Sequence, residues 1–240
     1  DTKSESFDSL FFPFISGQAR CFFVLLHIMN RTASFLMALC CMLTALHAQN
    51  SVFLQNAEQE LKELQDTMFF ADNDNERFNA NERFKEKLGN CLEMPNSFSH
   101  AFASLNKISV LTSQDKRFRI FTWAIISSEG SYDNFGFIQA KNEATDEYEV
   151  YPLLARNNEI YSPEEQKLSD SCWFGAVYYE LITSKYENIT YYTLLGWDGK
   201  DIYSKRKVIE PVTFKHNSGR PTFGASVFYK QKALKRMIFE

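Results

Sequence analysis

Apolar residues recur at helical spacing in the segment that follows residue 49. Successive members lie 3, 4, 3 and 4 positions apart, on one stripe of a helix: Leu54, Ala57, Leu61, Leu64 and Met68. The pattern predicts a helix over residues 52–70. Such a stripe packs either on the chain's own domain or on a partner helix, and the small number of heptads favours packing on the domain.

A polar cluster at residues 71–75 then predicts a turn and the start of a second helix, because Asn and Asp side chains cap helix N-termini. One side of this helix carries Phe84, Leu88, Cys91 and Leu92, and Pro95 bars its continuation. The sequence therefore predicts a pair of helices within a helical segment over residues 49–108.

From residue 109 onward, aromatic and β-branched runs alternate with turn clusters, which is typical of antiparallel strands. The predicted strands cover residues 118–126, 134–141, 148–153, 173–182, 190–197, 207–214, 222–228 and 236–240. Asp198-Gly199 is the strongest hairpin signal, and the connections are too short for crossover helices. We therefore expect an α+β fold, mainly antiparallel β with sandwich-, barrel- or propeller-like sheets, preceded by the N-terminal pair of helices.

The hydrophobic pattern also predicts the place of individual strands. The runs over residues 118–126 and 173–179 are apolar on both alternating faces, as central strands covered on two sides are. Pro152 and Pro211 predict edges or bulges, because proline cannot donate to a ladder. The last run stops at residue 240 without a polar tail, so we expect the β-rich domain, residues 109–240, to continue further. About 190 residues suffice for a domain with one core.

Residues 29–48 have the pattern of a secretory signal peptide. Met29 would begin it, Arg31 supplies the positive charge, residues 33–46 are apolar, and Ala48 offers a small residue for cleavage before Gln49. Residues 1–28 begin with aspartate rather than methionine, so we interpret them as translation upstream of the true start.

Two alternatives to an ordinary signal peptide are less well supported. A membrane-spanning helix needs about 20 apolar residues, and this run ends after Leu46. A lipoprotein signal has a small residue before the acceptor cysteine, whereas Leu39 precedes Cys40. The segment therefore predicts an exported protein, periplasmic or extracellular, with no membrane span after signal cleavage.

Composition restricts the function further. The chain has 26 basic and 30 acidic side chains, a formal net charge of -4, and no basic stripe, which argues against nucleic-acid binding. Cys91 and Cys172, the cysteines beyond the leader, form either one disulfide or two separately buried thiols. His100 and His216 have no neighbour at ligand spacing, so we predict no metal and no cofactor.

The aromatic content, 23 Phe, 11 Tyr and 3 Trp, suits a sheet-based core but also permits a binding platform. In such a platform sugars stack on aromatic rings, and an acidic side chain in the adjoining turn accepts hydrogen bonds from their hydroxyl groups. The candidate binding residues are Trp173, Tyr179, Tyr191, Trp197 and Asp198. The alternative is that these rings fill the core, and we favour it because large aromatic side chains dominate core energetics.

Acidic residues in or beside the predicted loops are candidates for acid-base catalysis: Glu129, Asp133, Asp146, Glu147 and Asp170. Pairing of carboxylates for glycoside hydrolysis depends on their distance and not on sequence order. The sequence contains no motif of serine hydrolases, zinc peptidases or nucleotide enzymes. We therefore assign no catalytic residue.

Several strings in the second half of the chain resemble a family of exported bacterial proteins of unknown function. They are FRIFTW (118–123), WFGAVYY (173–179), TYYTLLGWDG (190–199), KRKVIEPVTF (205–214) and RMIFE (236–240). The resemblance covers residues 75–240 and implies a signal peptide, export, and a chain that extends beyond residue 240. It implies no activity, ligand or catalytic residue, and it does not imply that Cys172 is required.

The sequence thus predicts an exported cell-envelope protein that acts as a non-catalytic binding or structural module, with a glycan or another envelope protein as its partner. The alternative is a glycan-directed hydrolase that uses a carboxylate pair.

Overall fold

The computed structural model describes residues 37, 42, 49–186, 189–230 and 232–240. Apart from Met37 and Met42, the predicted signal peptide over residues 29–48 and the whole of residues 1–28 lie outside the described residues. Residues Asn50–Glu240 form one compact unit. None of the described helices combines the length and the apolar character that crossing a membrane requires.

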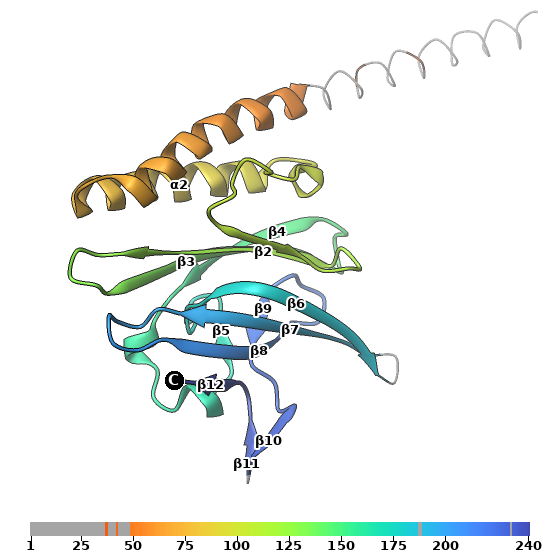
Figure 1. Cartoon of the computed structure of the whole chain (residues 1–240). Helices are drawn as coiled ribbons and strands as arrows, with labels where there is room; N and C mark the ends of the chain where they lie inside the picture. Colours follow the sequence, from red (N-terminus) through yellow and green to blue (C-terminus); the bar gives the residue numbers. More distant parts are fainter. Residues whose placement is uncertain (1–36, 38–41, 43–48, 187–188, 231) are drawn as a thin grey trace, which may run out of the picture. The chain divides into compact units, whose positions relative to one another are not determined.

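Two consecutive helices open the described part of the chain (Figure 1). Within the described residues, helix α1 covers 49–70, and helix α2 covers Asp74–Glu93. Asn73 caps α2, because its side-chain oxygen accepts a hydrogen bond of 2.9 Å from the backbone N–H of Glu76. Helix α2 ends just before Pro95, so the predicted pair of helices is confirmed.

The strands form two main sheets and a small hairpin (Figure 1). The four-stranded sheet has the order β1-β2-β3-β4, with bounds Ser109–Thr112, Phe118–Ile126, Tyr132–Lys141 and Tyr148–Leu154. The six-stranded sheet has the order β5-β9-β8-β7-β6. The bounds of these strands are β5 Leu168–Ser169, β6 Val177–Tyr186, β7 Ile189–Asp198, β8 Arg206–Phe214 and β9 Pro221–Phe223. Its sixth strand, β12 (Met237–Phe239), pairs with β8, while β10 (Phe228–Lys230) and β11 (Lys232–Leu234) form the hairpin. All pairs of these strands are antiparallel, as predicted.

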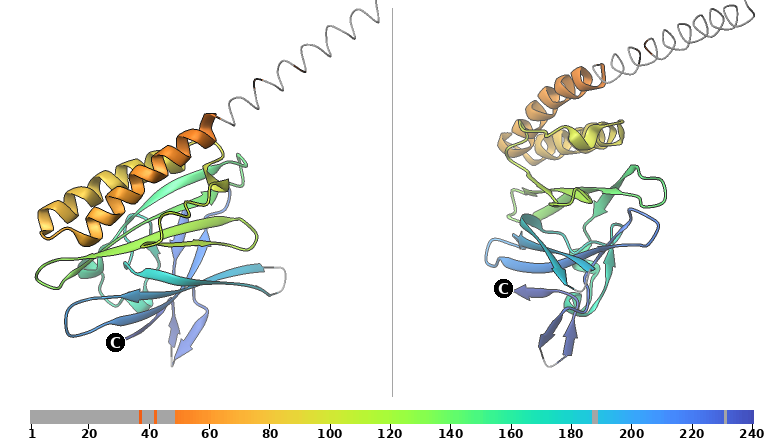
Figure 2. Two further views of the ribbon diagram at one scale, coloured as in Figure 1. Left: turned by 45° about the horizontal axis from the view of Figure 1, so that its top comes forward. Right: turned by 90° about the vertical axis from the view of Figure 1, so that its right-hand side faces the viewer.

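The four-stranded sheet is the middle layer of the compact unit. Helices α1 and α2 cover one of its faces, and the six-stranded sheet packs against the other (Figures 1 and 2). Successive side chains of a strand point to opposite faces, so β2 contributes to both sides. Phe121 and Trp123 pack with the helices, whereas Phe118 and Ile120 pack with the six-stranded sheet. The prediction of a two-sided β2 is confirmed, but the expectation of one core was wrong, because β2 takes part in two.

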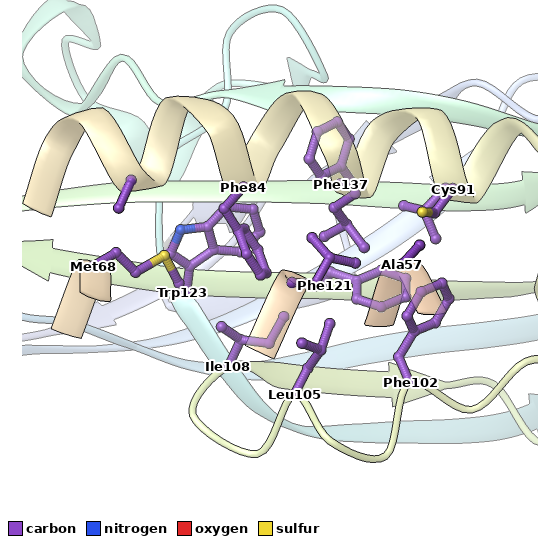
Figure 3. Packing of buried hydrophobic residues seen from close by; sticks show 14 of the residues in the cluster. Ala57, Met68, Phe84, Cys91, Phe102, Leu105, Ile108, Phe121, Trp123 and Phe137 are labelled. Carbon is purple, nitrogen blue, oxygen red and sulfur yellow. The ribbon is translucent and has the colours of Figure 1, made fainter. Parts of the chain in front are cut away.

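The core under the helices is rich in aromatic rings (Figure 3). Phe84 of α2 meets the indole ring of Trp123 edge-on, with 5.2 Å between ring centroids. Met68 of α1 lies beside the same indole in Figure 3. The indole N–H of Trp123 donates a hydrogen bond of 2.8 Å to the side chain of Asn81. The stripe predicted for the first helix is therefore the face that packs on the sheet.

The strand predicted over residues 173–182 was placed wrongly. Strand β6 begins only at Val177, because Gly175 adopts a left-handed conformation with φ +80°. It also forms an edge of its sheet, not the centre. Trp173 and Phe174 are buried nevertheless, because this irregular segment inserts into the core between the two sheets.

The prolines have different roles in the two sheets. Pro152 lies on β4, which is an edge strand as predicted. Pro211 lies inside β8, which is an interior strand, so that prediction was wrong. The backbone of Pro211 faces away from β7, and its carbonyl accepts a hydrogen bond of 2.7 Å from Gly224 N. On this side of β8 the neighbouring strand changes at Pro211 from β12 to β9. A missing N–H therefore interrupts no ladder at this position.

Two turn predictions also need correction. Asp198-Gly199 does not form a two-residue hairpin, since β7 ends at Asp198 and β8 begins only at Arg206. The strand predicted over residues 222–228 ends at Phe223, because Gly224 has φ +90°. Gly199 packs against the ring of Tyr132, and Gly224 approaches the side chains of Lys235 and Arg236.

Candidate functional site

The structure removes two residues from the predicted aromatic platform. Trp173 has no exposed surface, and its indole N–H donates a hydrogen bond of 2.8 Å to the hydroxyl of Tyr178. Asp198 is also buried, and its carboxylate accepts hydrogen bonds from Arg206 Nε (2.8 Å) and Asn134 Nδ2 (3.1 Å). Trp173 and Asp198 are therefore not part of an exposed platform, and Trp173 instead fills the core, as the favoured alternative predicts.

The other three platform residues keep some exposure. Tyr191 and Trp197 are half-buried and share one face of β7, because they are six positions apart. Tyr179 is 51% exposed at a bulge of β6, and the ammonium of Lys207 lies 4.9 Å from its ring centroid. Lys207 is the cross-strand partner of Trp197. Trp197, however, also lines a cavity that faces the helices.

This apolar cavity has a volume of about 320 Å³ and lies where the ends of α1 and β2 approach the beginning of β6 and the end of β7. Its lining residues are Met68, Phe69, Arg77, Lys107, Trp123, Ala124, Ile125, Ile126, Tyr132, Val177 and Trp197. The volume falls at the lower end of the range for small-molecule sites, and a mainly apolar wall with a few polar groups is typical of such sites.

Aromatic rings from three strands form one wall of the apolar cavity. The rings of Tyr132 and Trp197 meet edge-on at 89°, with centroids 5.3 Å apart. Val177 is the cross-strand partner of Trp197, so the two side chains lie next to each other on β6 and β7. An added Cβ at Gly199 would overlap the Tyr132 ring. The position therefore requires glycine, and the close backbone approach holds this aromatic wall in place.

Arg77 and Lys107 are the charged residues of the lining, and both are basic. Arg77 pairs with Asp74, whose carboxylate also accepts hydrogen bonds from the hydroxyl (2.7 Å) and the backbone N–H of Ser128. The hydrogen bonds from Ser128 hold the pKa of Asp74 below its ordinary value. Lys107 is exposed at the rim, and its ammonium lies 4.6 Å from the centroid of the Phe70 ring. Within the described part of the chain, Lys107 has no ion-pair partner.

Three buried hydrogen-bond donors around this cavity have no partner among the described residues: Gln65 Nε2, Arg77 Nε and Asn81 Nδ2. The amide oxygen of Gln65 accepts a hydrogen bond of 3.1 Å from Lys107 N, and the amide oxygen of Asn81 accepts from Trp123. Arg77 thus lines the cavity itself, whereas Gln65 and Asn81 are hydrogen-bonded to the lining residues Lys107 and Trp123. A buried donor without a partner is costly, so this region has a surplus of donors that favours an acceptor.

The five candidate carboxylates do not form a single site. Asp146 and Glu147 line an acidic groove of about 500 Å³ at the C-terminal end of α2, together with Glu93. Two stacked rings, Phe98 and Tyr148, with centroids 3.8 Å apart, lie in the same groove. Asp146 forms an ion pair of 2.6 Å with Lys141. This groove is therefore the place where the structure brings two predicted carboxylates beside aromatic rings.

The remaining three carboxylates lie elsewhere. Asp133 belongs to a larger groove of about 870 Å³ between α2 and strands β3 and β4, whose wall carries charges of both signs. Asp170 pairs with Arg220 at 2.9 Å, and Glu129 is exposed in the loop between β2 and β3. None of these three lines the groove that holds Asp146 and Glu147.

The pKa values of carboxyl groups bear on acid catalysis. Hydrogen bonds lower the pKa of Asp74, Glu149, Asp201 and Glu240, and at Asp115 they outweigh the opposing effect of burial. Each of these groups is thus held in its ionised form. A general acid at neutral pH needs a carboxyl group whose pKa is raised. None of these five groups therefore has the property that a glycosidase acid requires.

The two cysteines of the described region are both free. Cys91 packs in the core under the helices, and Cys172 lies against the core between the sheets, so the four-stranded sheet separates them. The alternative of two separate thiols is the correct one. Burial raises the pKa of the Cys91 thiol. No group of three or more His, Cys, Asp or Glu side chains within the described residues is placed to hold a metal.

The sequence predicted one residue of the apolar cavity, Trp197, and missed the others. Arg77 and Lys107 looked like ordinary surface charges, and Trp123 looked like a core residue, which it also is. A faint signal was present in the buried amides, because a polar Gln65 and Asn81 interrupt the apolar stripes of their helices.

Comparisons with known proteins identify no relative. A scan against protein-family models, a search of curated proteins and a search of solved structures each find no match.

Proposed function

We propose that the chain is a non-catalytic binding module that takes up a small, mainly apolar molecule in the apolar cavity. The observation that carries the proposal is the composition of the cavity wall, in which two tryptophans, a tyrosine, a phenylalanine and several other apolar side chains from α1 and four strands converge. A largely apolar pocket with a few placed polar groups is the usual form of a small-molecule site. We further propose, from residues 29–48, that the module works outside the cytoplasm.

The position of the apolar cavity supports a binding role. Its walls come from the helix pair, from the middle sheet and from the six-stranded sheet. Sites between packed layers are pre-formed by elements that are rigid for other reasons. Tyr132 and Trp197, for example, contact each other edge-on between strands of the two sheets.

Tryptophan fluorescence provides a direct test. Trp123 and Trp197 line the cavity, whereas Trp173 is buried elsewhere. We expect titration with neutral apolar probes of about ten non-hydrogen atoms, such as octanamide and octanol, to change the emission in a saturable way. The same titration followed by calorimetry would give the stoichiometry, which we expect to be one.

A cavity-filling variant locates the binding. Ala124→Phe places a ring where Ala124 lines the cavity, so we expect it to weaken probe binding at least tenfold. The matched control is Ala144→Phe in the exposed loop between β3 and β4, which should bind like the native chain. Melting curves of both variants show whether they fold. Unchanged binding to a folded A124F, or no saturable binding to the native chain, contradicts the proposal.

A glycan-directed hydrolase is the second candidate, because the acidic groove holds Asp146 and Glu147 beside the stacked rings of Phe98 and Tyr148. Retaining and inverting glycosidases use two carboxylates that flank the scissile bond, and sugars stack on exposed rings. The test is release of reducing ends from a glycan panel by the native chain and by Glu147→Gln. Glu129→Gln, in an exposed loop elsewhere, is the control. Activity that survives E147Q excludes this groove as the catalytic site.

A further inference from the structure

The charge of the apolar cavity selects among apolar ligands. Arg77 and Lys107 are the charged residues of its lining, and among the described residues no carboxylate lines it. Asp74 neutralises Arg77 from outside the lining and is itself held by Ser128. The exposed ammonium of Lys107 therefore leaves one positive charge at the rim that no described side chain compensates. One surplus positive charge matches a ligand with one negative charge.

The hydrogen-bonding groups around the cavity have the same preference. Arg77 Nε is buried without a partner, although the Nη2 atom of the same guanidinium donates to Asp74. The side-chain amides of Gln65 and Asn81, on the two helices, also have free N–H groups. The amide oxygen of Gln65 is hydrogen-bonded to Lys107, and that of Asn81 is hydrogen-bonded to Trp123. All three are donors. Of the three residues only Arg77 belongs to the cavity lining, and a carboxylate, whose two oxygen atoms only accept, is complementary to its free N–H.

The volume of the cavity sets the size of the apolar part. A water molecule takes up about 30 Å³ of liquid, so about 320 Å³ corresponds to roughly ten non-hydrogen atoms. An unbranched acid with eight carbons has that size. Its chain would lie against Trp123 and Trp197, and its head group would face Arg77 and Lys107 at the rim.

We infer that the ligand of the apolar cavity is an organic carboxylate with a compact apolar body, held by Arg77 and Lys107; this inference rests on the proposed binding function. It names a medium-chain fatty acid, or an aromatic acid of the same size, as the class of ligand. No bond is made or broken, since the site only binds.

The test compares eight-carbon probes that differ in charge. Octanoate carries the negative charge, octanamide has the same number of non-hydrogen atoms without it, and octylamine carries a positive charge. We expect octanoate to bind about tenfold more tightly than octanamide, because charge-assisted hydrogen bonds are stronger than neutral ones. Octylamine should bind more weakly than either. Tryptophan fluorescence and calorimetry measure all three dissociation constants.

Two lysine variants assign the effect to the rim. Lys107→Met keeps an unbranched side chain that is one atom shorter and removes its charge, so the tenfold preference for octanoate should disappear while octanamide binding changes less than twofold. The matched control is Lys167→Met, an exposed lysine outside the cavity lining, which should keep the preference. Lys107 is exposed, so the variant should fold, and its melting curve verifies this.

Each outcome separates the two proposals. Octanoate and octanamide binding equally well, or a preference that survives K107M, overturns the inference about charge and leaves the binding function intact. No saturable binding of any of the three probes overturns the binding function itself, and the inference falls with it. If K167M loses the preference for octanoate as completely as K107M does, the preference is a general electrostatic effect, and the assignment to Lys107 is overturned.

Discussion

Arg236 and Glu210 form an ion pair in which neither side chain is exposed to solvent. Arg236 also donates to the carbonyl oxygen atoms of Pro163 and Phe223, while Tyr178 donates its hydroxyl to Glu210. Desolvation is the main cause that raises the pKa of Tyr178, so this hydroxyl stays protonated as a donor. Because Arg236 directly precedes β12, the network joins the start of that strand to β8 and β6.

Removing one partner of this pair should be costly, because it leaves the other charge buried and uncompensated. We expect Glu210→Gln to lower the free energy of unfolding by about 3 to 5 kcal/mol. Denaturant titration measures the change. Glu165→Gln, which removes a surface ion pair with Lys232, should cost at most about 1 kcal/mol. An equal loss in both variants would show that burial of the Arg236–Glu210 pair does not matter.

Stability should decrease at acidic pH through Asp115. Its carboxylate accepts a hydrogen bond of 2.5 Å from the hydroxyl of Tyr192, which connects the turn before β2 to β7. Burial alone would raise the pKa of Asp115, but the hydrogen bonds outweigh it and the pKa is lowered. A lowered pKa in the folded state contributes stability above the unfolded value of about 3.9, and this contribution is lost as the pH falls through the folded value.

The measurement is the melting temperature between pH 6 and pH 3. We expect Asp115→Asn to melt at a lower temperature than the native chain at pH 6 and to show a smaller decrease below pH 4. Glu129→Gln, in an exposed loop without hydrogen bonds to its carboxylate in the described structure, should follow the native curve. Parallel curves for D115N and the native chain would contradict this role of Asp115.

The two thiols should differ in reactivity. Cys91 is buried and its pKa is raised by desolvation, whereas Cys172 is half-buried. Because the thiolate is the reactive form, we expect an alkylating reagent to modify Cys172 before Cys91 in the folded chain. Peptide mapping by mass spectrometry follows both sites. A peptide in which Cys91 is linked to Cys172 would contradict the separation of the two residues by the four-stranded sheet.

Two glycines should respond to alanine in opposite ways. Gly199→Ala would push the Tyr132 ring away from Trp197, so we expect lower stability and weaker binding of octanoate. Gly89→Ala adds a methyl group in the middle of α2, where its closest neighbour is the Phe137 ring at 3.6 Å, an ordinary contact. This change should raise stability by about 0.5 to 1 kcal/mol. Denaturant titration and fluorescence titration check the two variants, and a destabilised G89A would be inconsistent with the packing of Phe137.

The sequence could predict the elements whose pattern is periodic. The stripe from Leu54 to Met68 and the apolar alternation of residues 118–126 gave the first helix and β2, because their spacing has few structural alternatives. Trp173 shows why the prediction failed elsewhere. Its aromatic neighbours resemble a strand, but Gly175 turns the chain, and an irregular segment that fills a core has the same composition as a strand.

The apolar cavity could not be predicted from the sequence. Met68 and Trp197 are far apart along the chain and meet only because α1 and β7 approach from different layers. Arg77 has the sequence context of any charge in the first turn of a helix, and only its unpartnered Nε distinguishes it. Whether such a cavity forms depends on how far apart the packed layers lie, and no local sequence pattern encodes those distances.

The position of β2 between two sets of side chains determines how the chain should unfold. Phe121 and Trp123 complete the helical layer, while Phe118 and Ile120 complete the layer on the other side. Loss of this strand exposes apolar surface on both sides at once, so neither layer keeps enough buried area to persist alone. Far-UV dichroism of the helices and fluorescence of the tryptophans should therefore report a single cooperative melting transition.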